Sequence, residues 1–189
     1  MLLLPFDFNL TANTPATAAL KTAGCKTFED VCLYVAKLPY QRNMDKANSL
    51  CVVNEQCGTC STKHVLLKTI AEEHNRNDIH LVIGIFLMTS SNTPKITAVL
   101  NSFNLRYIPE AHCYLTYEGK IYDFTFHNTN LDFDQDLLEE HIVNAADVAR
   151  EKINLHQQYI RKWSKREEIP YALEEIWQIR ELCISALSK

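Results

Sequence analysis

The stretch that begins at Gly58 constrains the fold most, because it contains no further glycine or proline until Gly84. Its apolar residues recur at the spacing of one helix face, which predicts a helix over about 59–74. Residues 79–88 (IHLVIGIFLM) are rich in β-branched side chains and indicate a buried strand. The chain is therefore expected to start a helix at about Cys60 and to follow it with a core strand.

The rest of the chain shows weaker but consistent patterns of helices and strands. The expected elements are a helix over 27–38 with Thr27 as N-cap and Pro39 beyond its end, a short helix within 90–104 with Thr93 as N-cap and Pro94 at its first position, a hairpin over 111–126 with its turn at Glu118-Gly119, a helix from about 134 to 167, and a last helix over 171–187. This order of helices, strands and helices indicates an α+β fold. We expect a single domain over 1–189, with a core at about 25–130 and a helical extension at about 134–189.

Composition and charge narrow the choice of partners. The net charge of −4 and the pI near 6.0 give no broad basic field, so a nucleic-acid partner is not expected. The first ten residues lack the basic region of a secretory signal, and no run approaches the roughly 20 apolar residues that span a bilayer. We therefore expect a cytoplasmic protein without a membrane partner.

Cysteine usage points to single thiols rather than to a disulfide framework. The chain has seven cysteines, an odd number, and no recognisable signal. Most of them are expected to be small buried hydrophobic residues. Cys60 differs because a cysteine in the first turn of a helix is favoured as the thiolate, which is the nucleophilic form. The N–H groups of such a turn can also stabilise an oxyanion, so Gly58 and Thr59 are candidates for oxyanion or substrate contacts.

A base for this thiol is expected on the hairpin. With Glu118-Gly119 as a two-residue loop, Tyr117 pairs with Lys120, and the same register places Asp123 near Tyr114 on the opposite strand. His112 and Asp123 then become diagonal neighbours that can reach each other on one face. A carboxylate so placed holds the imidazole in the tautomer that serves a nucleophile.

Three pieces of sequence carry a resemblance to a known family. GTCS opens a helix, AHCYL lies on a strand, and YDFT follows on the next strand. Together they resemble the bacterial transglutaminase-like superfamily, whose members share a papain-like core and use Cys, His and Asp in that chain order. The resemblance covers about residues 28–127 and implies that Cys60, His112 and Asp123 form a catalytic triad. It implies a nucleophile helix packed on an antiparallel sheet, to which the C-terminal helices are added.

The resemblance also implies a chemistry. Such a triad hydrolyses or transfers the acyl group of an amide or ester, and the substrate is a peptide, a protein or a small amide. No cofactor and no metal are expected, and the sequence leaves the oligomeric state open. Papain-like enzymes supply an oxyanion-hole glutamine shortly before the cysteine, and Gln56 is the candidate for that role.

Three other interpretations remain open. Cys57 and Cys60 form a C-x-x-C pair that could serve a thioredoxin-like thiol–disulfide oxidoreductase, with Pro109 in the place of its cis-proline. Cys57, Cys60 and His64, completed by His112 or Cys113, could hold zinc, although a second ligand pair is missing. A transglutaminase-like domain without catalysis, acting as a binding module, is the third.

Several further residues are expected to have ordinary structural roles. His64 is interpreted as a partly exposed helix histidine, and Lys63 as a solvated lysine that lies near the thiol. Glu110 either touches a substrate or caps a loop. Trp163 and Trp177 are expected to be packing anchors, and the charged run RKWSKREE at 161–168 a solvated helix end.

Overall fold

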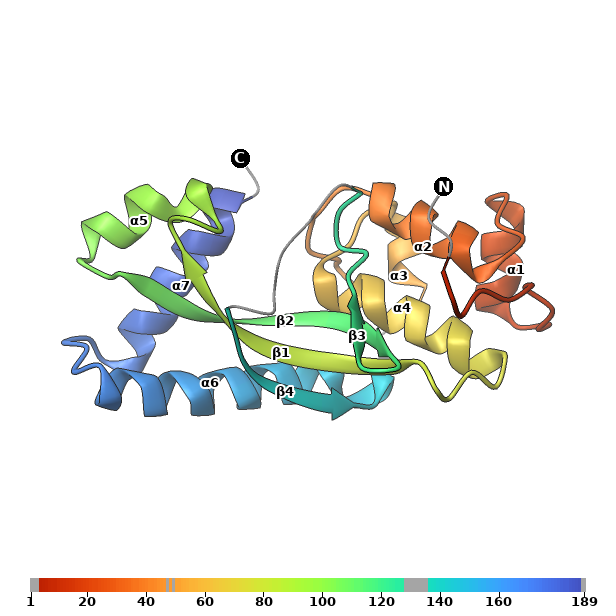
Figure 1. Ribbon diagram of the computed structural model, residues 1–189. Helices are drawn as coiled ribbons and strands as arrows, with labels where there is room; N and C mark the ends of the chain where they lie inside the picture. The colour runs from red at the N-terminus through yellow and green to blue at the C-terminus, as the bar shows by residue number, and fades with distance from the viewer. Residues whose placement is uncertain (1–3, 47, 49, 128–135, 188–189) are drawn as a thin grey trace. The chain divides into compact units, whose positions relative to one another are not determined.

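A computed structural model describes residues 4–46, 48, 50–127 and 136–187 (Figure 1). It is an α+β protein in which helices accompany one four-stranded antiparallel sheet. The elements are α1 (Pro15–Thr22), α2 (Phe28–Lys37), α3 (Cys51–Glu55), α4 (Cys60–Glu73), β1 (His80–Thr89), η1 (Pro94–Ile96), α5 (Thr97–Ser102), β2 (Tyr107–Tyr117), β3 (Lys120–Tyr122), β4 (Leu137–Val143), η2 (Ala145–Asp147), α6 (Val148–Arg166) and α7 (Leu173–Leu187). The predicted fold class is confirmed at this level.

The two helices expected in the first third of the chain form because their caps are encoded locally. Thr27 accepts a hydrogen bond from Asp30 N–H, and the Asp30 carboxylate accepts one from Thr27 N–H, which completes a capping box at the start of α2. Thr59 and Thr62 make the corresponding pair at the start of α4. Both predicted helix starts are thereby confirmed.

The hairpin has the predicted register. Tyr117 pairs with Lys120 and Leu115 with Tyr122, and the loop residues Glu118 and Gly119 both have positive φ, at 49° and 72°. Two such residues form the turn that matches the twist of antiparallel strands. However, β3 ends at Tyr122, so the ladder does not extend to Asp123 as predicted.

The prediction of one continuous helix from about 134 is wrong. Residues 134 and 135 lie outside the described part of the chain, and Leu137–Val143 form strand β4 at the edge of the sheet, which has the order β3-β2-β1-β4. Burial alternates along β4 with the period of two that one packed face of a strand produces. The ladder with β1, in which Leu87 N–H donates to Asp136 O at 2.8 Å just before β4, outweighs the local helix propensity.

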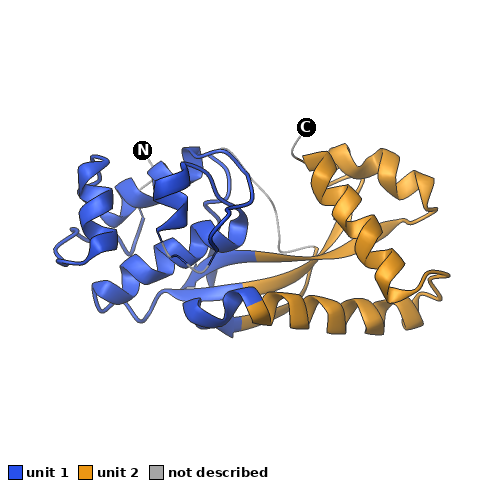
Figure 2. Cartoon of the chain, turned by 180° about the vertical axis from the view of Figure 1, so that it is seen from behind, with its two compact units in different colours: residues 1–82, 113–129, 142–149 blue, residues 83–112, 130–141, 150–189 orange. Residues whose placement is uncertain are grey.

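The chain groups into two compact units, which Figure 2 shows in different colours. Unit 1 comprises residues 1–82, 113–129 and 142–149, and unit 2 comprises 83–112, 130–141 and 150–189. The core of unit 1 includes Phe6, Leu20, Phe28, Val31, Leu66, Leu67 and Ile70, and that of unit 2 includes Ile83, Ile85, Leu100, Ile108, Ile160, Trp163 and Ile176. The single domain expected from the sequence remains a prediction.

Among the described residues, no helix combines the length and the apolar character that crossing a membrane requires.

Candidate functional site in unit 1

Cys60 occupies the first position of α4. Short helix α3 is followed by its C-cap Gln56, which has a left-handed conformation with φ 52°. Cys57 and Gly58 then lead the chain into the Thr59 cap. The Cys60 side chain is buried in the first turn. The partial positive charge of a helix N-terminus favours a thiolate at this position. The helix start that was predicted for Cys60 is therefore present.

Gly58 is required here by close packing. A Cβ atom at this position would lie 2.9 Å from Lys63 Cγ, 3.0 Å from Thr62 Oγ1 and 3.1 Å from Val52 Cγ2. The Gly58 N–H donates to Pro39 O at 3.1 Å. Gly58 therefore makes room for the Lys63 side chain, and its N–H is directed at the backbone of residue 39.

The other two oxyanion candidates also use their donors within the fold. Thr59 N–H donates to Thr62 Oγ1 at 2.9 Å as part of the cap. Gln56 is exposed, and its side-chain amide donates to Tyr34 Oη at 2.7 Å and to Val53 O at 2.6 Å. The Gln56 side chain is thus held by α2 and α3.

Lys63 is completely buried, contrary to the expectation of a solvated lysine. Its Nζ donates to Leu38 O and to Thr125 O, at 2.7 Å each. Burial lowers the pKa of Lys63 to about 8, against the opposing effect of negative charge on Asp123, Cys60 and Cys57. No pattern in the sequence indicates this burial, since a lysine in a helix is usually exposed.

His64 is also completely buried, so its interpretation as a partly exposed residue is wrong. Its Nδ1 lies 2.8 Å from Cys60 O, and Phe124 N–H donates to its Nε2 at 2.9 Å. Because Nε2 accepts, the proton of the neutral ring lies on Nδ1 and is donated to the Cys60 carbonyl. His64 therefore joins the first turn of α4 to the segment that follows β3.

That segment carries Asp123, whose side chain is 7% exposed. Thr125 donates to Asp123 Oδ1 twice, from its N–H at 2.8 Å and from its hydroxyl at 2.6 Å. This local bonding explains why the D-x-T spacing matters, since the threonine two residues on fixes the carboxylate. Asp123 Oδ1 also lies 3.5 Å from His64 Nε2.

Unit 1 thus joins the segments of two of the three predicted catalytic residues. Lys63 and His64, consecutive in α4, bond to Thr125 O and to Phe124 N–H, and so connect the helix of Cys60 to the segment of Asp123. The third predicted catalytic residue, His112, belongs to unit 2. Its ring makes an edge-on contact with Phe86, with 6.0 Å between the ring centroids.

The next residue after His112 belongs to unit 1 and lies close to the Cys60 turn. Cys113 Sγ is 3.4 Å from Ser61 Oγ, and Ser61 Oγ is 3.9 Å from Cys60 Sγ. Cys113 is completely buried, as are the two residues that follow it in β2, Tyr114 and Leu115.

The cysteines of the chain have the burial expected of core residues. All seven are buried thiols, and burial raises the pKa of Cys25, Cys32, Cys51 and Cys183. This confirms their interpretation as small hydrophobic residues. Cys57 lies beside Asn43, whose amide donates to Cys57 O at 3.0 Å.

The geometry gives little support to the thioredoxin-like and zinc interpretations. No peptide bond within the described residues is cis, so Pro109 is trans, whereas the thioredoxin-like interpretation gave it the cis-proline position. Among the described residues no group of three or more His, Cys, Asp or Glu side chains is arranged to hold a metal ion. Both ring nitrogens of His64 contact the backbone.

Unit 2 contains a buried ion network that the sequence did not predict. Arg180 makes two hydrogen bonds to the Glu110 carboxylate and one, at 2.7 Å, to Glu181. His156 Nε2 lies 2.8 Å from Pro109 O and 3.9 Å from Glu110. Glu110 is therefore held by α7, in place of the loop cap or substrate contact expected for it.

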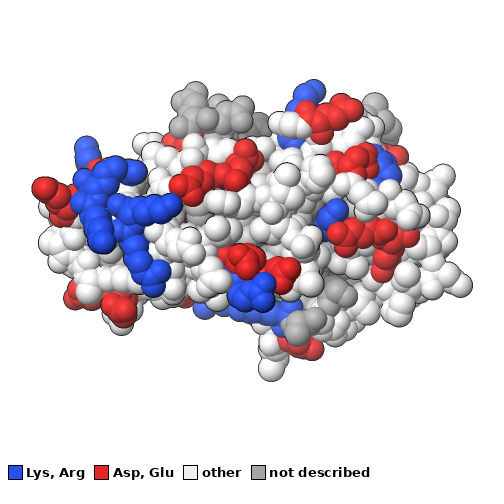
Figure 3. All heavy atoms as spheres, turned by 90° about the horizontal axis from the view of Figure 1, so that it is seen from below, with Lys and Arg blue, Asp and Glu red and all other residues white. Residues whose placement is uncertain are grey.

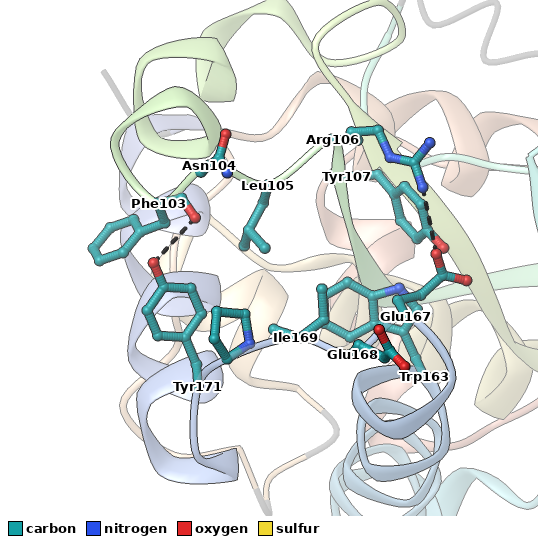
Figure 4. A pocket seen from close by; sticks show the side chains of 11 residues that line it. Phe103, Asn104, Leu105, Arg106, Tyr107, Trp163, Glu167, Glu168, Ile169 and Tyr171 are labelled. Atoms are coloured by element: carbon teal, nitrogen blue, oxygen red, sulfur yellow. Dashed lines mark hydrogen bonds and ion pairs between the residues drawn. The ribbon is translucent and has the colours of Figure 1, made fainter.

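Unit 2 also contains a pocket of about 320 Å³ between the start of β2 and the turn that joins α6 to α7 (Figure 4). Its lining includes Phe103, Tyr107, Trp163, Glu167, Ile169 and Tyr171. Trp163 is 1% exposed, and its indole N–H has no hydrogen-bond partner within the described residues. Tyr107 packs against it at 5.7 Å between ring centroids, which agrees with the predicted role of Trp163 as a packing anchor.

The basic residues near the end of α6 face solvent. Figure 3 shows Lys and Arg side chains gathered at the left of the view, the side on which α6 ends in Figure 1. Arg161, Lys162, Lys165 and Arg166 are exposed, and Arg166 pairs with Glu167 at 3.0 Å. The interpretation of this run as a solvated helix end is confirmed.

Comparison of the chain with protein-family models, curated proteins and solved structures gives no match.

Proposed function

We propose that this protein is a cysteine-dependent hydrolase or acyl transferase that acts on an amide or ester carbonyl, with Cys60 as nucleophile, His112 as general acid and base, and Asp123 as the group that orients His112. The observation that carries the proposal is the position of Cys60 at the first residue of α4, in a turn bonded through Lys63 and His64 to the segment of Asp123. A helix start and a fixed carboxylate are two of the parts that such a triad needs.

The residue that follows His112 contacts the nucleophile turn. Consecutive Cα atoms lie about 3.8 Å apart, and Cys113 Sγ contacts Ser61 Oγ, one residue beyond Cys60. Successive side chains of a strand point to opposite faces, so this contact places the backbone of β2 beside the turn and does not itself direct the imidazole at Cys60. The role of His112 rests on the transglutaminase-like order of Cys, His and Asp in the chain.

In the proposed reaction the Cys60 thiolate attacks the carbonyl carbon and forms a tetrahedral intermediate. The backbone N–H of Cys60, at the helix start, stabilises its oxyanion. The imidazolium of His112 protonates the leaving amine or alcohol as the C–N or C–O bond breaks, which leaves a thioester on Cys60. Neutral His112 then takes a proton from water or from an acceptor amine, whose attack releases the acyl product and restores the thiolate.

A simple ester tests this proposal without knowledge of the natural substrate. With p-nitrophenyl acetate we expect rapid release of nitrophenolate and an acetyl group on Cys60, located by peptide mass spectrometry. Cys60→Ala should remove the acetylated peptide, and His112→Ala should slow acetylation at pH 6.5 by about 10²-fold, because only about 1% of a thiol with the free pKa of about 8.5 is ionised there.

Cys57→Ala is the matched control, because Cys57 is a buried thiol in the same motif. Its acetylation rate should stay within about twofold of the wild type, as for a residue outside the reaction. Acetylation spread over several cysteines and lysines, with no loss in His112→Ala, would contradict the proposal.

A further inference from the structure

Lys63 is an unusual residue to find in the core beside a proposed nucleophile. It is completely buried three residues after Cys60 in α4, and its Nζ contacts two backbone carbonyls. Removing an ammonium group from water costs several kcal/mol before its partners are counted. An apolar side chain of similar length fills such a space at lower cost, so packing alone does not explain a lysine here.

Gly58 leaves the space that the side chain of Lys63 occupies. A Cβ on Gly58 would lie 2.9 Å from Lys63 Cγ, closer than such contacts occur. The glycine that precedes the Thr59 cap thus gives the lysine stem its path into the core. The motif GTCSTK therefore encodes a buried cation together with the space that the cation needs.

The charges that act on Lys63 lie on the segment after β3 and around the start of α4. Asp123, Cys60 and Cys57 are the groups whose negative charge favours the protonated lysine. Through Thr125 O, the ammonium group also holds the residue whose N–H and hydroxyl fix the Asp123 carboxylate. The lysine is thus linked to the nucleophile by charge and, through Thr125, to the carboxylate of Asp123 by hydrogen bonds.

We propose that Lys63 is a positioning residue whose buried positive charge stabilises the Cys60 thiolate and whose hydrogen bond to Thr125 fixes the segment of Asp123. This inference rests on the proposed function of Cys60. It assigns Lys63 a task that an isosteric apolar residue cannot perform.

The pH dependence of stability follows from the lysine. The folded protein holds the pKa of Lys63 at about 8, below the ordinary 10.5. The unfolded chain therefore binds more protons at Lys63 between these values, and this group makes the free energy of unfolding rise as pH increases from about 8 to 10.5. At neutral pH the charge opposes folding, so it is retained at a cost in stability.

The test is the thiol pKa of Cys60 in Lys63→Met, measured from the pH dependence of iodoacetamide alkylation with the modified peptide identified by mass spectrometry. We expect the pKa of Cys60 to rise by about one unit, so that alkylation at pH 6.5 falls about tenfold. At a pH where the thiol is fully ionised, the two proteins should react at similar rates.

Lys68→Met is the matched control. Lys68 is a buried lysine of the same helix, whose Nζ donates to Ile79 O at 2.8 Å and lies 3.3 Å from Glu72. Its loss should change the denaturation midpoint without changing the Cys60 profile. If wild-type Cys60 has a low pKa and Lys63→Met leaves that pKa unchanged, the role proposed for Lys63 is wrong and the proposed function stands. If wild-type Cys60 titrates as an ordinary thiol, at about 8.5, the proposed function itself fails.

A second measurement does not depend on the folding of Lys63→Met. In protein labelled with ε-¹³C lysine, the Lys63 resonance should titrate at lower pH in Cys60→Ser than in the wild type, because the serine removes the thiolate charge. The Lys68 resonance should depend on pH in the same way in both proteins. An identical Lys63 titration in both proteins would overturn the inference.

Discussion

Glu110→Ala is expected to lower the free energy of unfolding by about 3–5 kcal/mol, the range found when one partner of a buried ion pair is removed. The Glu110 and Arg180 side chains are 7% and 11% exposed, and the variant leaves the guanidinium buried without its main carboxylate. Guanidinium chloride denaturation followed by circular dichroism measures the change.

Glu181→Ala is the control for that loss. Glu181 also accepts a hydrogen bond from Arg180, at 2.7 Å, but its side chain is 37% exposed. A pair of this kind contributes about 0–1 kcal/mol. Equal losses in the two variants would show that the Glu110 pair is not the anchor of α7 that the structure indicates.

The same network gives a pH dependence with a definite sign. Burial raises the pKa of Glu110, but the positive charges of Arg180 and His156 outweigh it, so the pKa lies below its usual 4.5. This carboxylate therefore contributes stability above pH 4.5 that is lost as pH falls through the folded-state pKa. Burial lowers the pKa of His156, so protonation of this group also destabilises the fold below pH 6.5. In Glu110→Gln the first contribution should disappear, which acid denaturation curves can measure.

His64→Leu is expected to lower the free energy of unfolding by about 2–4 kcal/mol. Leucine fills the space, but Phe124 N–H loses its acceptor and Cys60 O loses the hydrogen bond from the His64 ring. Both contacts are buried and short, at 2.9 Å and 2.8 Å. The variant should also loosen the segment of Asp123, visible as faster amide exchange at residues 123–125.

His74→Leu is the control for His64, because His74 repeats the same arrangement at the end of α4. Its Nδ1 lies 2.8 Å from Ile70 O, and its Nε2 accepts from Thr11 N–H at 2.9 Å, in a more exposed setting. Water can replace a bond there, so the loss should be smaller, at about 1 kcal/mol. A larger loss at His74 than at His64 would contradict the role assigned to His64.

Elements with local signals were the ones that the sequence predicted well. Helix α2 starts after the threonine predicted to cap it, and α4 starts at Cys60 as predicted, because each cap is formed within three residues. The hairpin register followed from the two-residue turn. In contrast, residues 137–143 have no such local signal, since their strand exists only by pairing with β1, a distant segment.

The site was predictable to a similar extent. The helix start at Cys60 could be read from Gly58 and Thr59, and the link between Asp123 and Thr125 from their spacing. The burial of Lys63 and His64 could not, because their partners are backbone groups of residues 38, 124 and 125, which only the folded chain brings near α4.

The measurement that tests the central claim most directly is site-mapped alkylation of the reduced protein with iodoacetamide from pH 5 to 9, in the wild type and in His112→Ala. The account predicts that Cys60 alone reacts well below the free-thiol pKa of about 8.5, and that His112→Ala removes this early reaction. Early reaction of Cys57 instead would favour the oxidoreductase interpretation. If no cysteine reacts below pH 8, Cys60 is not an activated nucleophile and the proposed function is wrong.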